Sequence, residues 1–161
     1  MNIILTGPKH CGKSTLVSKI IENYRGRISG FISEFDDRSS DTRKLLIRSI
    51  NGADNACAVT WSNSSYSVNF DVFDIFAPEL IDLSSDLIVF DELGKFESSC
   101  NKLQDAVEQA FSSATDVIAV LRLDAPAWIN ELKLRSDVMV IIVNTENRDN
   151  LVCEINDLIN S

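Results

Sequence analysis

The fold of this chain is decided by the stretch Gly7-Pro8-Lys9-His10-Cys11-Gly12-Lys13-Ser14. It matches the pattern G-x-x-x-x-G-K-[ST], in which two glycines bracket four variable residues and a lysine precedes a hydroxyl. A short apolar run, residues 3–6, comes directly before it, and residues 14–24 carry apolar side chains at helical spacing. A buried strand followed by a helix is the setting in which this pattern forms a phosphate-binding loop. The sequence therefore predicts a P-loop at residues 7–14.

Each residue type in this loop has a chemical reason. Gly7 and Gly12 let the backbone fold into a ring of N–H groups that approach phosphate oxygens closely. The helix that starts near Lys13 adds the positive end of its dipole at the same point. Lys13 supplies a mobile charge for the β- and γ-phosphates, and the Ser14 hydroxyl is a ligand for Mg²⁺. The predicted nucleotide-binding residues are Gly7, Pro8, Lys9, His10, Cys11, Gly12, Lys13, Ser14 and Thr15.

The composition narrows the class of protein. With 161 residues, 45% of them hydrophobic and 24% charged, the chain has the make-up of one soluble globular domain over residues 1–161. Its net charge of −9 argues against a nucleic-acid partner, because phosphate backbones repel an acidic surface. Any nucleotide must therefore be held by local charges, and its Mg²⁺ complex makes that easier.

The cysteines and the apolar runs bear on location. The four cysteines form no C-x-x-C pair and only one histidine is present, so there is no zinc pattern. Free thiols in a reducing cytosol fit this pattern best. No signal peptide is visible, and the apolar runs have the length of strands, far short of a membrane span. We therefore expect a cytoplasmic protein with no membrane partner, and no protein partner is indicated.

Strand and helix patterns alternate along most of the chain. Strands are predicted at residues 2–6, 28–35, 87–90, 117–121 and 138–143, and helices at residues 14–24, 100–111, 127–134 and 148–159. Residues 43–70 instead contain short β-type runs separated by turn residues, which is typical of antiparallel hairpins. A polar loop is predicted at residues 36–41. A further helix is predicted over residues 75–83, with Pro78 either in its first turn or breaking it.

These segments together predict an α/β fold of the P-loop NTPase type. We expect a three-layer sandwich, with a mostly parallel sheet and helices on both of its faces. An inserted antiparallel β region, at about residues 36–70, interrupts this arrangement.

Two acidic residues follow the strand predicted at residues 87–90. Ligands in such sheets bind at the carboxyl ends of the strands, so Asp91 should emerge at the same edge as the P-loop. A carboxylate there holds Mg²⁺ directly or through water, which is the Walker B role. Glu92 can accept a proton from an attacking water, and a mere nucleotide binder has no need of such a base. The pair predicts hydrolysis, with Ser14 and Asp91 as the metal ligands; the alternative is a solvated acidic turn.

Four segments resemble one known family in their order along the chain. They are the P-loop, Gly30-Phe31-Ile32-Ser33-Glu34, Asp86-Leu87-Ile88-Val89-Phe90-Asp91-Glu92-Leu93-Gly94-Lys95-Phe96-Glu97 and Asn144-Thr145-Glu146-Asn147-Arg148-Asp149. The chain resembles the THEP1-type nucleoside-triphosphatases over nearly its whole length. The most specific part is D-E-[IL]-G-K-[MF]-E after the Walker B strand, whereas residues 36–67 and 122–126 depart from the family pattern.

The resemblance carries its own expectations. It implies a RecA-related P-loop fold with an inserted β region, and slow hydrolysis of nucleoside triphosphates with broad base tolerance. It also implies that Glu34, Lys95 and Glu97 belong to the region of the site.

Charge that develops on the γ-phosphate is stabilised by a further cation, supplied by this chain or by a partner. Arg122 is favoured, because it ends the strand expected beside Asp91. Arg135 and Lys95 compete with it, and the alternative for each is a surface cation lying over apolar neighbours. The candidate catalytic residues are Lys13, Glu92, Lys95 and Arg122.

Other polar and aromatic residues are interpreted mainly as structural. Cys11 is read as a loop filler, although loop amides would favour its thiolate. His10 is a loop filler or a contact to the edge of a base. Trp61 and Trp128 could stack on a base, but core packing is the more common role. Arg148 opens the last predicted helix.

Three functions are compatible with these residues. The leading one is Mg²⁺-dependent hydrolysis of nucleoside 5′-triphosphates, ATP, GTP and others, to diphosphate and phosphate, with Glu92 orienting the water. A small nucleotide or nucleoside kinase is the first alternative, with Glu92 serving an acceptor hydroxyl, but no arginine-rich lid is present. A regulatory module with incidental turnover is the second. Residues 143–147 supply no N/T-K-x-D motif, so guanine specificity is not predicted.

Overall fold

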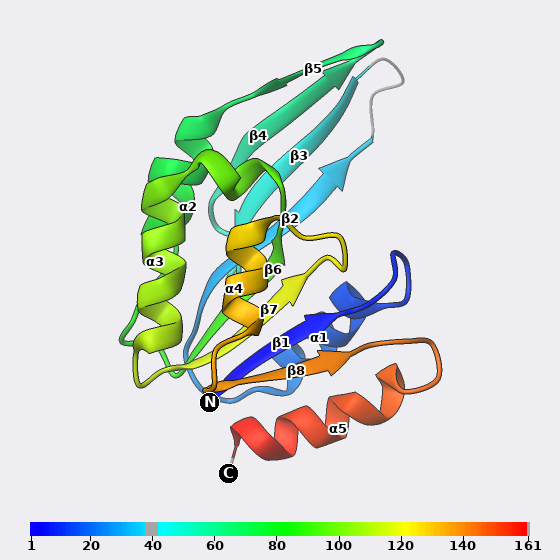
Figure 1. Cartoon of the computed structure of the whole chain (residues 1–161), viewed down its shortest axis with the longest axis vertical. Coiled ribbons are helices and arrows are strands. Elements are labelled where there is room, and N and C mark those ends of the chain that lie inside the picture. Colours follow the sequence, from blue (N-terminus) through cyan, green and yellow to red (C-terminus); the bar gives the residue numbers. More distant parts are fainter. Residues whose placement is uncertain (38–41, 161) are drawn as a thin grey trace.

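The described residues of the chain form a single sheet. The computed structural model describes residues 1–37 and 42–160, and in these the strand order is β5-β4-β3-β2-β6-β7-β1-β8 (Figure 1). The strands are β1 (Asn2–Thr6), β2 (Ile28–Asp36), β3 (Thr42–Ser49), β4 (Asn55–Ser62), β5 (Ser65–Val68), β6 (Leu87–Leu93), β7 (Asp116–Leu121) and β8 (Val138–Ile142). Most of the loop predicted at residues 36–41 lies outside the described residues.

Five neighbouring strands make a parallel half, consisting of β2, β6, β7, β1 and β8. β1 pairs in parallel with β7 and β8, and β6 pairs in parallel with β2 and β7. Every residue of β1 is buried, as are residues 87–91 of β6. Strands covered on both faces must be apolar on both, which explains the continuous apolar runs.

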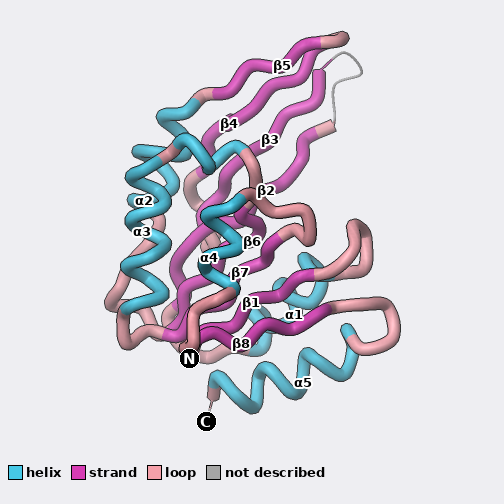
Figure 2. The backbone as a smooth tube through the Cα atoms, in the orientation of Figure 1, coloured by secondary structure: helices cyan, strands magenta, loops and turns pink. Residues whose placement is uncertain are grey.

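Helices cover the two faces of the parallel half (Figure 2). Ile3 packs with the apolar residues of α1 and α5, whereas its neighbour Ile4 packs with those of α3 and α4 on the other face. Successive side chains of a strand point to opposite faces, so one strand supplies both clusters. The helices are α1 (Lys13–Asn23), α2 (Ala77–Glu79), α3 (Asn101–Ser112), α4 (Ala127–Lys133) and α5 (Arg148–Ile159). The predicted three-layer sandwich is confirmed.

The remaining strands, β3, β4 and β5, form the inserted antiparallel region, called the insert below. β3 pairs with β2, β4 with β3, and β5 with β4, all antiparallel. Residues 28–32 of β2 pair with β6, but residues 33–36 pair only with β3. The insert therefore extends past the carboxyl ends of the parallel strands, on the continuation of β2 (Figure 1).

The helix predicted at residues 75–83 differs from the observed one. The chain forms a π-helical segment, Val72–Phe76, followed by the short α2, and the helix ends at Glu79. It starts earlier than predicted because Val72 and Phe73 are buried in the core, and Leu83 beyond its end is exposed. None of the helices among the described residues is long and apolar enough to cross a membrane.

Candidate functional site

The loop between β1 and α1 depends on two glycines. A Cβ on Gly7 would lie 2.2 Å from the carbonyl oxygen of Val143, so only glycine fits beside the end of β8. Gly12 has a φ of 101°, and a Cβ there would meet the side chain of Arg148 at 2.9 Å. Among the described residues, no side chain caps the first turn of α1. Its N–H groups are therefore available to the oxygens of an anion.

Lys13 lies folded across this loop. Its side chain is buried, and Nζ donates hydrogen bonds to the carbonyl oxygens of Gly7 at 3.0 Å and Pro8 at 2.8 Å. A buried ammonium group needs such acceptors. Phosphate oxygens in the loop would compete with these neutral carbonyls for the same donor, since charged acceptors bind an ammonium group more strongly.

Ser14 and Asp91 join the P-loop to the end of β6. Ser14 Oγ donates a hydrogen bond to Asp91 Oδ1 at 3.2 Å. Burial raises the pKa of Asp91 to about 6, and the hydrogen bond from Ser14 opposes that rise. A hydroxyl and a carboxylate are the hard oxygen ligands that Mg²⁺ prefers, and it commonly takes only one or two from the protein. These two side chains therefore fit a magnesium ion that is shared with phosphate.

Glu92 follows Asp91 and faces Arg122. The peptide bond between Asp91 and Glu92 is cis. Arg122 Nε lies 3.6 Å from Glu92 Oε1, and both side chains are about one-third exposed. Burial raises the pKa of Glu92, and the attraction to Arg122 opposes that rise. Arg122 directly follows β7, and β7 pairs with β6, so the strand that Arg122 ends lies next to Asp91 as predicted.

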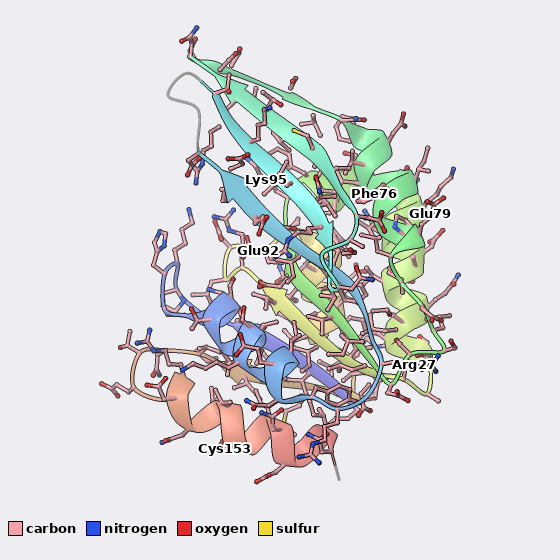
Figure 3. The ribbon with its side chains drawn as sticks, turned by 180° about the vertical axis from the view of Figure 1, so that it is seen from behind. Arg27, Phe76, Glu79, Glu92, Lys95 and Cys153 are labelled. Carbon is pink, nitrogen blue, oxygen red and sulfur yellow. The ribbon has the colours of Figure 1, made fainter. Side chains whose placement is uncertain are left out.

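One cavity of about 850 Å³ brings the predicted site residues together. The four candidate catalytic residues, Lys13, Glu92, Lys95 and Arg122, line it, as do both candidate metal ligands. Of the predicted nucleotide-binding residues, all but Cys11 line the cavity; Cys11 is buried, with its Sγ 3.9 Å from Lys13 Nζ. Figure 3 shows Glu92 and Lys95, both of which line this cavity.

The turn after β6 contributes Lys95 and Glu97. Lys95 Nζ lies 5.0 Å from the centroid of the Phe96 ring and 5.9 Å from that of Tyr66. Glu97 is 3% exposed, and its Oε2 accepts a hydrogen bond from the N–H of Gly94 at 3.1 Å. Burial raises the pKa of Glu97 to about 7, against its backbone hydrogen bonds. Both residues line the cavity, as the resemblance implied.

Two candidates lie elsewhere. Glu34 is partnered by Arg48 at 3.2 Å across β2 and β3, and it does not line the cavity. Arg135 pairs with Asp137 at 2.8 Å before β8 begins, at the amino end of the parallel strands. The site lies at their carboxyl ends, so Arg135 cannot compete with Arg122.

Several residues of the cavity wall were not expected from the sequence. Arg148, interpreted as structural, lines the cavity and also lies over Gly12. Its place in the family-like segment that starts at Asn144 was the feature of the sequence that could have indicated a role in the site. The others are Ser33, Phe35, Arg43, Leu45, Gly94, Phe96, Leu123 and Asp124. Those from β2 and β3 enter the wall only through the antiparallel register, which no local pattern reveals.

The strand order and the glycine-lysine loop facing Asp91 define the P-loop NTPase class of folds. A family model described as NTPase matches residues 2–156, and the chain belongs to this family. Nucleoside-triphosphatase THEP1 of Thermotoga maritima is 30% identical over 163 residues, covering 96% of this chain and 93% of that protein. The resemblance drawn from the Asp91–Glu97 segment and its companions is therefore confirmed.

Solved structures agree with this assignment. The crystal structure of THEP1 from the hyperthermophile Aquifex aeolicus has a TM-score of 0.82 and 27% identity, and both chains are covered completely. The solution structure of a human cancer-related nucleoside triphosphatase has a TM-score of 0.77 at 24% identity, covering 98% of this chain and 96% of that one. The second comparison concerns the fold alone.

Proposed function

We propose that this chain hydrolyses nucleoside 5′-triphosphates to diphosphate and phosphate with Mg²⁺, and accepts several bases. Membership of the NTPase family supports an enzyme of this general kind. The observation that carries the finer proposal is the hydrogen bond between Ser14 and Asp91, with Glu92 lining the same cavity. It joins the phosphate-binding loop to a carboxylate pair at the correct edge of the sheet.

In this proposal the P-loop binds the triphosphate. The N–H groups of the loop and of the first turn of α1 bind phosphate oxygens, and Lys13 turns from its carbonyl partners to the β- and γ-phosphates. Ser14 and Asp91 would hold Mg²⁺, which when bound neutralises charge on the phosphates. Broad base tolerance is supported by the lack of a guanine-reading motif in residues 143–147.

Glu92 orients the attacking water and takes its proton. Its pKa is raised by burial, so it is a stronger base than an exposed glutamate, and the nearby Arg122 keeps it oriented. Arg122, whose Nε lies 3.6 Å from Glu92 Oε1, and Lys95, which lines the same cavity, are the further cations that we assign to the γ-phosphate. They stabilise the charge that develops as the bond to the β-phosphate breaks.

The test is phosphate release from ATP, GTP, CTP and UTP by the purified protein, with Mg²⁺ and with EDTA. We expect release from all four nucleotides, and none once the metal is chelated. Release confined to one nucleotide would remove the base tolerance, and release unaffected by EDTA would remove the metal from the proposal.

The free cysteines of the described residues also support a reducing, cytoplasmic location for this single domain.

A further inference from the structure

The cavity continues past the P-loop onto one face of the insert. Partners in an antiparallel pair point to the same face of a sheet. The register pairs Phe35 with Leu45, and Arg43 with Trp61. The turn after β6 lies opposite this face across the cavity, because residues of the turn and of the face line the same cavity. The insert compartment is defined here as Phe35, Arg43, Leu45, Lys95 and Phe96.

This compartment has an aromatic and cationic surface. The guanidinium carbon of Arg43 lies 3.8 Å from the centroid of the Phe35 ring, yet Phe35 remains 52% exposed. Trp61 lies beside these rings on the same face, with its ring centroid 5.8 Å from that of Phe35 and 6.0 Å from that of Phe96. Rings held in place beside cations bind flat heteroaromatic groups by stacking.

The compartment lies on the side from which the γ-phosphate is attacked. An in-line displacement needs its nucleophile opposite the β-phosphate, which the P-loop holds. We take Glu92 as the γ end of the triphosphate, and Lys95 and Phe96, three and four residues further along the chain, line the same cavity. Thr15 and Arg148 line the cavity on the α1 and α5 side, which leaves that side for the base and ribose of the triphosphate.

The size of the cavity agrees with two ligands. Its volume of about 850 Å³ lies near the top of the range for ligand pockets, roughly 300–1,000 Å³. A water molecule needs only a small part of the space beyond Glu92. The net charge of −9 disfavours a nucleic-acid strand, so a small molecule is the better occupant.

We propose that the insert compartment binds a nucleoside-type molecule, a planar heteroaromatic ring that carries a hydroxyl, and that this hydroxyl accepts the γ-phosphoryl group. The hydroxyl oxygen forms a bond to the γ-phosphorus as the bond to the bridging oxygen breaks, and the electron pair leaves with the diphosphate. The hydroxyl proton passes to the Glu92 carboxylate. Water takes the place of this hydroxyl when the compartment holds no acceptor. This proposal rests on the triphosphate site of the proposed function.

Binding is tested without turnover. The chain has two tryptophans, so Trp128→Phe leaves Trp61 as the only one, next to the compartment. In that background we titrate adenosine, guanosine, cytidine and uridine, and follow Trp61 fluorescence. A saturable change is expected, and Phe35→Ala should weaken binding by about fivefold to a hundredfold. Phe70→Ala removes an equally exposed ring outside the cavity and should leave the affinity unchanged.

Two outcomes of this titration decide about the compartment. The fluorescence change should persist in a Lys13→Ala variant, because the compartment does not use the P-loop. If no nucleoside changes the fluorescence, or if Phe35→Ala binds as well as the parent protein, the proposed compartment is wrong.

Transfer is tested with ATP labelled in its γ-phosphate, Mg²⁺ and each nucleoside. We expect labelled nucleoside monophosphate, and a fall in its share of the product in Phe35→Ala. Phosphate release without any labelled nucleoside overturns the transfer and leaves the hydrolysis in place. If neither product forms, the proposed hydrolysis and the transfer both fail, while the fluorescence titration still decides about the compartment.

Discussion

The parallel half and the insert bury their strands differently. In the parallel half β1 is covered on both faces, and every one of its residues is buried. In the insert only some residues of β3 and β4 are buried, and β5 has none that are fully buried. The two regions nevertheless share one sheet and one core cluster, which contains both Ile47 of β3 and Phe90 of β6.

The difference separates two tasks within one site. The parallel half fixes the positions of Lys13, Ser14 and Asp91, because β1 and β6 cannot shift without exposing apolar side chains to water. The insert has one face that is open to the cavity, and Phe35 and Arg43 on that face form the wall farthest from the P-loop. We infer that phosphate chemistry belongs to the first region and the choice of a second reactant to the second region.

The largest effect is expected from Lys13→Ala, which removes the P-loop lysine of the parallel half. The variant loses the buried ammonium group that the P-loop holds for the β- and γ-phosphates. Phosphate release should fall to background. Lys19→Ala is the matched control, since this residue lies on the same helix, exposed and paired with Asp149. Full activity in Lys13→Ala would refute the site.

Glu92→Gln separates chemistry from binding. The amide cannot take the proton of the attacking water, so kcat should fall by about 10²–10⁴-fold while KM changes little. Steady-state phosphate release measures both quantities. Glu34→Gln, a change of the same size at an exposed glutamate outside the cavity, should retain normal turnover. An unchanged kcat in Glu92→Gln would assign the base elsewhere.

Ile47→Ala and Ile118→Ala test whether the two regions fold together. One residue lies in the insert and the other in the parallel half, and both are essentially buried. Each substitution should lower the free energy of unfolding by about 2–5 kcal/mol in one urea transition, since the regions share a sheet. Ile47→Val should cost only about 0.5–1.5 kcal/mol. A separate early transition in Ile47→Ala would show that the insert folds on its own.

Glu97→Gln tests the junction of the two regions through pH. The pKa of this carboxyl is raised from 4.5 to about 7 by burial, so the folded protein holds a proton that the unfolded chain releases. Its stabilising contribution is complete below pH 4.5 and is lost as the pH rises through 7. From pH 5 to 8.5 the wild type should lose up to roughly 3 kcal/mol relative to the glutamine variant. Urea midpoints at both pH values measure this difference, and parallel pH profiles would contradict the assignment.

The parallel half was largely predictable from the sequence. Its apolar runs are long, and its candidate site residues follow those runs or a strong motif, so the positions of Asp91 and Arg122 at the edge that carries the cavity were predicted from strand ends alone. The helix over Arg148–Ile159 was predicted with its observed bounds, because Leu151, Ile155 and Ile159 repeat at helical spacing and are buried.

The cavity wall of the insert was not predictable in the same way. Phe35 and Arg43 come together through the antiparallel register, which depends on a connection between strands and not on a local period. Glu34 and Phe35 are neighbours on β2 that point to opposite faces, so only the second reaches the cavity. Arg148 was underestimated because a residue that opens a helix has an obvious structural role.

The attachment of the insert has a consequence for how this chain can diverge. In the part of the chain that the structure describes, β2 is its only strand partner in the parallel half, and β2 is one of the two outer strands of that half. Strands beyond it can be lengthened, shortened or replaced without a break in the pairing of β6, β7 and β1. If the proposed roles hold, changes in the insert alter what enters the cavity and leave the loop between β1 and α1 in place. On the proposed function, a new reactant can therefore be accommodated without a change in the loop that holds the triphosphate.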